Sequence, residues 1–375
     1  MKKLIGLGLA ILLVIAMPQS VFSEEGHSPK KVFIVHSYSP REIHGGMGIE
    51  MGMLDKLKQL GYEEGKDIEF SRFFMDTQTK YKTIEDVKMR AEMALAEIKV
   101  IDPDIIIVFD DNAFEHVGLP LAKTKYLILF NGVNLNPEYY DAKVDFMETR
   151  EHPGYNITGI IEQSLPFMAN QLMKRLLPQA KAMAAVCTTG YPFFVQMAKD
   201  FQEDIQAHPE RYPLKLKKMY TTSSWEEYQK ITLEINQMDD IDAVSHLCTG
   251  LYDKEGRAIP ADEAVRWIVT HQDKPTFTPW NFFVDMGFLA AAPVDFELLG
   301  AKTAIQVHQV LSGESPGDIP IGFPLDFYIA INLARARQLG LEISLEILSE
   351  AREIFTEMSA YPEYRYKINN NKNNR

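Results

Sequence analysis

Short apolar runs alternate with helical patterns along most of the chain, and this alternation is the feature that most restricts its fold. Runs with strand character lie at 31–36, 68–74, 105–109 and 126–130, and helical patterns at 47–60 and 81–99 separate the first three. Near-continuous apolar strands joined by helices indicate a parallel sheet that is covered on both faces. We therefore expect an α/β architecture.

The same alternation starts again in the second half of the chain. Helical patterns lie at 165–177, 193–207, 224–238 and 261–271, and strand-like runs lie at 182–187, 214–220, 243–248 and 275–278. The sequence thus predicts two doubly wound parallel-sheet lobes of similar size. The later units at 288–311 and 318–341 are expected to return to each lobe in turn, so that several crossings form a hinge.

These patterns predict where the chain divides. We expect lobe 1 at 30–156 plus 284–318 and lobe 2 at 157–283 plus 319–360, followed by a polar tail at 361–375. Right-handed crossovers place the carboxyl ends of the strands at one edge of each sheet. Ligands of such folds bind beyond those ends, so two facing lobes predict a ligand cleft.

The first 23 residues have the pattern of a cleaved signal peptide. Lys2 and Lys3 precede the apolar segment 4–17, and Val21-Phe22-Ser23 offers a small-residue cleavage site. The apolar segment is short for a membrane span, and no later stretch is long and apolar enough for one, so we expect a periplasmic, secreted protein that is not itself membrane-spanning. The net charge of −13 argues against nucleic acid as a partner, because phosphate binding needs clustered Lys and Arg.

The chain has two cysteines, Cys187 and Cys248, and each ends an apolar run. An oxidising compartment would allow them to pair. Neighbouring parallel strands rarely offer the geometry of a disulfide. Two buried free thiols are therefore the alternative, and the sequence leaves the choice open.

Polar and aromatic residues follow most of the predicted strands, at the edge where the cleft is expected. The Ser, Thr, Asp, Asn and Gly residues among them also suit helix caps and turns. Aromatic residues at turn positions are not explained in this way. The candidate ligand-binding residues are Ser37, Tyr38, Asp110, Asn112, Gly132, Val133, Asn134, Tyr191, Thr249, Gly250, Trp280, Phe283 and Asp285.

Patterns that carry catalysis are poor by comparison. The sequence has no HExxH or GxxxxGK[ST] motif, no GxGxxG after the first strand and no GxSxG elbow after a predicted strand. The nine histidines show no spacing typical of metal ligands. Asp110 and Asp111 leave a strand in different directions, so they rarely share one acid/base site. We expect no enzyme, no cofactor and no metal site.

An ordered series of short motifs resembles a known family. The motifs are GYEEGKD (61–67), PDIIIV (103–108), PGYNITG (153–159), LPQAK (177–181), GFLA (287–290), ELLGA (297–301), LSGE (311–314), DIP (318–320) and INLARARQLG (331–340). Together they span roughly residues 31 to 345 and resemble the ABC transporter substrate-binding family that includes the tryptophan-binding lipoproteins.

The resemblance implies a type I periplasmic-binding-protein fold whose two lobes close on a small solute and deliver it to an ABC permease and its ATPase. Two turns depart from the usual family pattern, at Asp110-Asp111-Asn112-Ala113 and at 132–137. These versions look more like a branch that serves in extracellular sensors. The alternative function is therefore an extracytoplasmic ligand sensor that presents its ligand to a separate signalling receptor.

The character of the loops suggests the ligand. Aromatic residues fit a flat or apolar side chain, amides at helix amino ends fit a carboxylate, and Asp110 or Asp111 fits an amine. An aromatic or branched amino acid satisfies all three expectations. We expect Asp110 to face the ligand and Asp111 to cap the helix that begins at Asn112.

Overall fold

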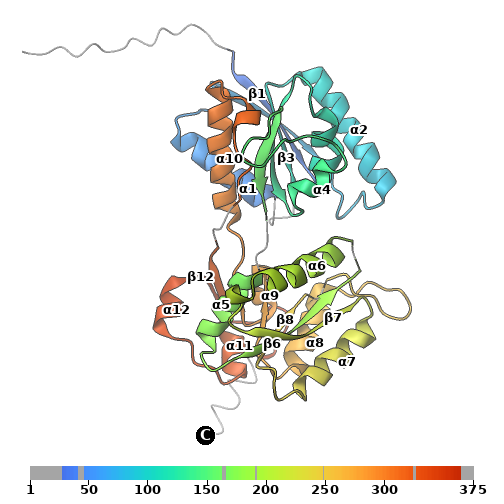
Figure 1. Cartoon of the computed structure of the whole chain (residues 1–375), viewed down its shortest axis with the longest axis vertical. Helices are drawn as coiled ribbons and strands as arrows, with labels where there is room; N and C mark the ends of the chain where they lie inside the picture. Colours follow the sequence, from blue (N-terminus) through green and yellow to red (C-terminus); the bar gives the residue numbers. More distant parts are fainter. Residues whose placement is uncertain are drawn as a thin grey trace, which may run out of the picture.

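The computed structural model consists of two lobes stacked along the long axis of the molecule (Figure 1). It describes residues 28–40, 46–162, 166–190, 192–247, 249–323 and 327–364, and of residues 192 and 193 it describes only the backbone. The predicted signal segment, Tyr191 and Cys248 lie outside the described residues. Each lobe is a sheet with helices on both faces, which confirms the predicted α/β class.

The first lobe holds a five-stranded sheet in the order β2-β1-β3-β4-β5, with all pairs parallel. Its central strands are almost wholly buried because helices cover both of their faces. The strands are β1 (Lys30–His36), β2 (Ile68–Phe74), β3 (Ile105–Phe109), β4 (Leu127–Val133) and β5 (Ile157–Ile161).

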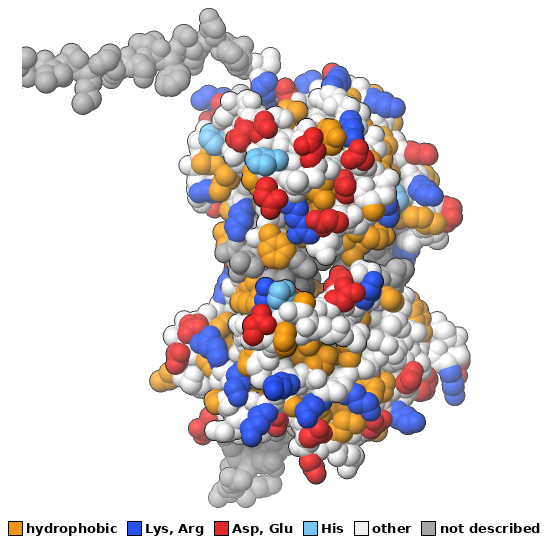
Figure 2. All heavy atoms as spheres, in the orientation of Figure 1, with side chains coloured by type: hydrophobic (Ala, Val, Ile, Leu, Met, Phe, Trp, Pro, Cys, Tyr) orange, Lys and Arg blue, Asp and Glu red, His pale blue; other side chains and the backbone are white. Residues whose placement is uncertain are grey.

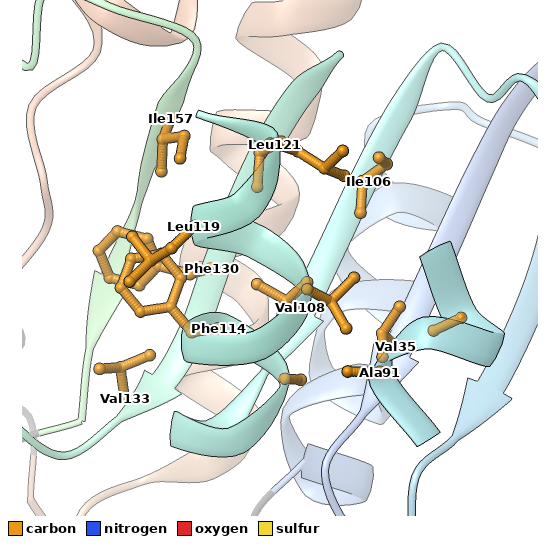
Figure 3. Packing of buried hydrophobic residues seen from close by; sticks show 14 of the residues in the cluster. Val35, Ala91, Ile106, Val108, Phe114, Leu119, Leu121, Phe130, Val133 and Ile157 are labelled. Carbon is orange, nitrogen blue, oxygen red and sulfur yellow. The ribbon is translucent and has the colours of Figure 1, made fainter. Parts of the chain in front are cut away.

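Two hydrophobic layers cover the faces of this sheet. One layer contains residues of α2, α4 and the three short turns after β3, and Figure 3 shows Phe114 and Leu119 of these turns beside Phe130 and Val133 of β4. The other layer contains residues of α1 and α10, which lie side by side. The elements are α1 (Gly46–Gln59), α2 (Ile84–Ile101), α3 (Asp110–Ala113), η1 (Phe114–Gly118), η2 (Leu119–Leu121), α4 (Pro137–Asp141), α10 (Phe296–Leu311) and η4 (Pro316–Asp318).

Two glycines allow α1 and α10 to touch through their backbones. A methyl group at Gly52 would overlap the carbonyl oxygen of Glu297, and one at Gly300 would overlap the carbonyl oxygen of Ile49. The side chain of Asn131 adds a link by donating to the carbonyl oxygen of Leu299 at 3.1 Å. The helix that arrives from the second lobe is therefore tightly built into the first.

The second lobe holds a seven-stranded sheet in the order β12-β11-β10-β9-β8-β6-β7. All pairs are parallel except β10 with β11, which are antiparallel. The strands are β6 (Ala182–Thr188), β7 (Lys215–Thr222), β8 (Ala243–His246), β9 (Thr276–Thr278), β10 (Ala290–Ala291), β11 (Ile329–Asn332) and β12 (Ala351–Phe355).

Helices again cover both faces of this sheet. Residues of α5, α6 and α12 pack on one face, and residues of α7, α8 and α9 pack on the other. The elements are α5 (Pro166–Leu176), α6 (Pro192–Ala207), η3 (Pro209–Arg211), α7 (Trp225–Asn236), α8 (Ala261–His271), α9 (Asn281–Met286), α11 (Leu333–Gln338) and α12 (Leu345–Glu350).

The sheets divide the chain at points that differ from the expected boundaries. Residues 157–161, expected in lobe 2, form β5 of the first sheet because they pair with β4. Residues 284–291, expected in lobe 1, belong to α9 and β10 of the second. The expected polar tail also begins too early, since Tyr361 is buried in the second lobe.

Candidate functional site

The carboxyl edges of the two sheets face each other where the chain passes between the lobes. β5 ends at Ile161 and the chain then enters the second lobe, so the carboxyl edge of the first sheet lies at this passage. β10 is parallel to β9 and ends shortly before α10 begins in the first lobe, so the second sheet has its carboxyl edge there too. Figure 2 shows the molecule narrowing between the lobes. Facing carboxyl edges are where such folds bind ligands.

Asp110, at the start of α3, is buried in an unusual backbone conformation. Its φ is +69°, in the left-handed region, and only 3% of the residue is exposed. A methyl group at Gly46 would lie 3.2 Å from its Oδ2, and one at Gly132 would lie 3.2 Å from its Oδ1. The carboxylate therefore fits between two residues that lack side chains. Gly46 begins α1, whose amino end favours a negative charge.

Asp111 fastens the loop that follows β4. Its Oδ1 accepts hydrogen bonds from the backbone N–H of Asn134 at 3.2 Å and from the Tyr140 hydroxyl at 2.5 Å. Its Oδ2 accepts from the side-chain amide of Asn134 at 2.9 Å. Burial raises the pKa of the Asp111 carboxyl, although the hydrogen bonds from Tyr140 and Asn134 act to lower it.

The prediction that Asp111 caps its helix is wrong, because its carboxylate is turned toward this loop. The hydroxyl of Ser37 has that role: it donates to the carbonyl oxygen of Phe109 and accepts from the N–H of Ala113, both at 2.8 Å. Asn112 joins the same cluster by donating to the Thr77 hydroxyl at 2.9 Å. Tyr38 follows Ser37 and is half-buried.

Glu162 also lies at this edge, although it was not among the predicted site residues. It follows β5 directly, and its N–H donates to the carbonyl oxygen of Val133 at 2.8 Å. Only 6% of the residue is exposed. Burial, followed by the negative charge of Asp111, raises the pKa of the Glu162 carboxyl to about 8.

Three threonine hydroxyls gather at the facing edge of the second lobe. Thr188 ends β6, Thr278 ends β9, and Thr249 follows β8, which lies between those two strands. Each hydroxyl oxygen is buried and has no hydrogen-bond partner within the part of the chain that the structure describes. A buried polar group without a partner is uncommon and costs about 1–3 kcal/mol. Three such hydroxyls lie at the ends of the neighbouring strands β6, β8 and β9.

The loops around these hydroxyls bring backbone and aromatic groups to the same edge. A methyl group at Gly190 would overlap the carbonyl oxygen of Gly250, which itself has a φ of +74°. The half-buried Trp280 directly precedes α9, and its ring centre lies 6.0 Å from that of Phe194 and 5.8 Å from that of Phe282. The second lobe thus offers hydroxyls next to an aromatic cluster.

Several predicted site residues lie elsewhere. Val133 and Phe283 are fully buried in the hydrophobic cores of their lobes. Asp285 lies in the last turn of α9, where its carboxylate accepts a hydrogen bond from the Ser359 hydroxyl at 2.7 Å. Tyr191 lies outside the described residues.

No cluster of three or more His, Cys, Asp and Glu side chains suits a metal ion, as far as the described residues reach. Within the same part of the chain, no helix has the length and apolar character that a bilayer crossing requires.

The sequence model of the family described as ABC transporter substrate binding protein matches residues 142–355, more than half of the chain. The chain belongs to this family. Members of the family are substrate-binding proteins of ABC transport and typically act outside the cytoplasm, and the family is not one of enzymes. Membership implies a small-molecule ligand and an ABC transporter as partner. No curated protein matches the chain.

Solved structures agree on the fold. A conserved domain protein from Vibrio cholerae is 22% identical, with a TM-score of 0.60, over 87% of this chain and 100% of that one. A ligand-free, open substrate binding protein with adhesive properties from Clostridium difficile is 17% identical, with a TM-score of 0.69, over 88% and 100%.

An ABC domain from Streptococcus pneumoniae, solved in complex with L-Trp, is 19% identical, with a TM-score of 0.61, over 88% of this chain and 100% of that one. These likenesses confirm the predicted periplasmic-binding-protein fold.

Proposed function

We propose that this substrate-binding protein is exported, captures an amino acid with an aromatic or branched side chain between its lobes, and delivers it to an ABC permease. The observation that carries the proposal is the row of buried threonine hydroxyls at 188, 249 and 278. Hydroxyls that lack a partner are donors for a ligand with oxygen acceptors, and a carboxylate accepts several such bonds at once.

The neighbouring side chains support the rest of the ligand. Trp280 and Phe282 are half-buried beside these hydroxyls, and aromatic rings of this kind favour a flat or branched apolar side chain. The first lobe contributes the buried carboxyl groups of Asp111 and Glu162 at the opposite edge, which favours a ligand that also carries an amine. The structural neighbour in complex with L-Trp makes amino acids the first class to test.

Replacing the threonines by valine distinguishes threonines that bind a ligand from threonines that are only buried. Thr188→Val and Thr278→Val remove a hydroxyl and keep the shape of the side chain, so each variant is expected to be more stable than the wild type without ligand, by about 1 kcal/mol. The same variants are expected to bind their amino acid about tenfold more weakly, since a hydrogen bond to a charged group is lost. Thr221→Val, on the exposed side of β7, is the matched control.

The ligand is identified by mass spectrometry of what co-purifies with the protein and by a thermal-shift screen of amino acids and related acids. Binding is then measured by calorimetry. The proposal fails if no amino acid binds, or if the two threonine variants bind as the wild type does. Delivery is tested by the uptake of labelled ligand in cells that lack the gene, where uptake at the wild-type rate would refute it.

A further inference from the structure

The carboxyl group of Glu162 is buried, and no described residue supplies a counter-charge to it. Only 6% of the residue is exposed, yet no hydrogen bond or ion pair reaches its carboxylate from any residue that the structure describes. A buried carboxylate of this kind is costly unless another group compensates it. Glu162 therefore needs an explanation that β5 and its neighbours do not provide.

Asp111 is the charged group that acts on Glu162, and the described side chains on and after α4 have other partners. Asp111, on α3, is itself acidic, and its oxygens are occupied by Asn134 and by the Tyr140 hydroxyl of α4. Of the basic side chains on and after α4, Lys143 pairs with Glu115 at 2.7 Å and Arg150 pairs with Glu138. The two buried carboxyl groups at the passage between the lobes thus have no cationic partner among the residues that the structure describes.

The position of Glu162 connects this charge with the ligand. Glu162 directly follows β5 at the carboxyl edge of the first sheet, and this edge faces the edge of the second sheet that holds Thr188, Thr249 and Thr278. A ligand held by those hydroxyls through its carboxylate presents its other end to the first lobe. An ammonium group at that end has three hydrogen-bond donors and a positive charge. Both suit the Glu162 carboxylate, which receives neither a hydrogen bond nor an ion pair from the described residues.

We infer that Glu162 binds the protonated amine of the ligand, so that the protein selects zwitterionic amino acids over the corresponding acids that lack an amine. The inference rests on the proposed function and adds the residue that distinguishes ligands with a positively charged amine from ligands without one. A bare metal ion is a poorer match, because the described residues offer no third carboxylate, His or Cys at this place and the oxygens of Asp111 are already used.

Recognition of the amine also couples binding to a proton. Without ligand, burial and the charge of Asp111 raise the pKa of Glu162 to about 8, so at pH 7 the carboxyl is mostly protonated. An ammonium beside it favours the ionised form. Binding of an amino acid at pH 7 is therefore expected to release a proton, whereas binding of an acid without the amine is not.

The experiment compares two ligand pairs by calorimetry, L-tryptophan with indole-3-propionate and L-leucine with 4-methylpentanoate. The proteins are the wild type, Glu162→Gln and Glu151→Gln, the last being an exposed glutamate on the same lobe. Measurements in phosphate and in Tris buffer report the proton, because the ionisation heats of the two buffers differ. Circular dichroism verifies that each variant is folded.

The wild type and Glu151→Gln are expected to bind the amino acid at least tenfold more tightly than its partner acid, and to release a proton. Glu162→Gln is expected to lose this preference and the proton release while it still binds the partner acid. Wild-type discrimination in Glu162→Gln, or equal binding of both members of a pair by the wild type, overturns the inference and leaves the proposed function standing. Failure of every amino acid to bind overturns the proposed function and the inference with it.

Discussion

Glu162 makes the ligand-free protein less stable as the pH rises, and Glu162→Gln is expected to remove this effect. The pKa of the carboxyl is about 8 in the folded protein, against an ordinary value of 4.5. Below pH 4.5 the group is protonated in the folded and the unfolded chain alike, so it adds no pH dependence. Between pH 4.5 and about 8 the folded protein holds a proton that the unfolded chain has released, so the free energy of unfolding falls as the pH rises.

The size of the effect follows from the same shift. One pKa unit corresponds to about 1.4 kcal/mol, so the whole window corresponds to about 5 kcal/mol. Above pH 8 the group is ionised in both states and the difference stays constant. Glutamine keeps the shape of the protonated side chain without its titration, so the variant should match the wild type near pH 4.5 and exceed it progressively toward pH 8.5.

Urea unfolding at pH 4.5, 6, 7 and 8.5 measures the difference directly. The free energy of unfolding of Glu162→Gln minus that of the wild type is expected to rise by several kcal/mol across the series, with Glu151→Gln following the wild type throughout. Because all other groups are shared, their titration cancels in the difference. A difference that stays constant with pH would refute the conclusion that Glu162 is buried without compensation.

Three further predictions concern other contacts. Gly300→Ala should lower the free energy of unfolding by about 2 kcal/mol, because the added methyl group overlaps the backbone of Ile49; this cost exceeds the helix preference of alanine. An unchanged urea midpoint would contradict the close approach of α1 and α10. Ser37→Ala should lower it by about 1–2 kcal/mol through loss of its two buried hydrogen bonds, and equal stability would show that the cap adds nothing. Burial raises the pKa of Cys187 to about 12, so in a Cys248→Ser variant a thiol reagent at pH 8 should react only after unfolding; fast reaction of the folded variant would disprove this.

Most of the fold could be predicted because most of its helices and strands have local sequence patterns that indicate them. The run IIIVF forms β3 at the predicted bounds 105–109, and α8 has the bounds 261–271 that were predicted for this helix. Two strands, β5 and β12, could not be predicted from the sequence, and each for a physical reason. β5 contains Thr158 and Gly159 within a short run, and β12 at the sheet edge is only half-buried, so its sequence shows no continuous apolar run.

The candidate site was predictable only in part. The predicted strand ends point to the edge at which Thr249, Gly250 and Trp280 lie, whereas the last residues of the strands, Thr188 and Thr278, were not among the candidates; a role of these residues in ligand binding stays a prediction. The cap of α3 comes from Ser37, which lies 76 residues before its partner Ala113, so no local pattern reveals it. Glu162 has nothing in its sequence context that distinguishes a buried glutamate from a solvated one.

The return of the chain from the second lobe fixes the order in which the protein is completed during synthesis. The first lobe lacks α10 until β6 to β10 have been made, and the second lobe lacks β11 and β12 until after α10. A nascent chain that ends at residue 291 therefore contains two unfinished lobes, rather than one finished lobe and one to follow. Both cores close late and in quick succession, so each exposes apolar surface for most of the time that the ribosome needs.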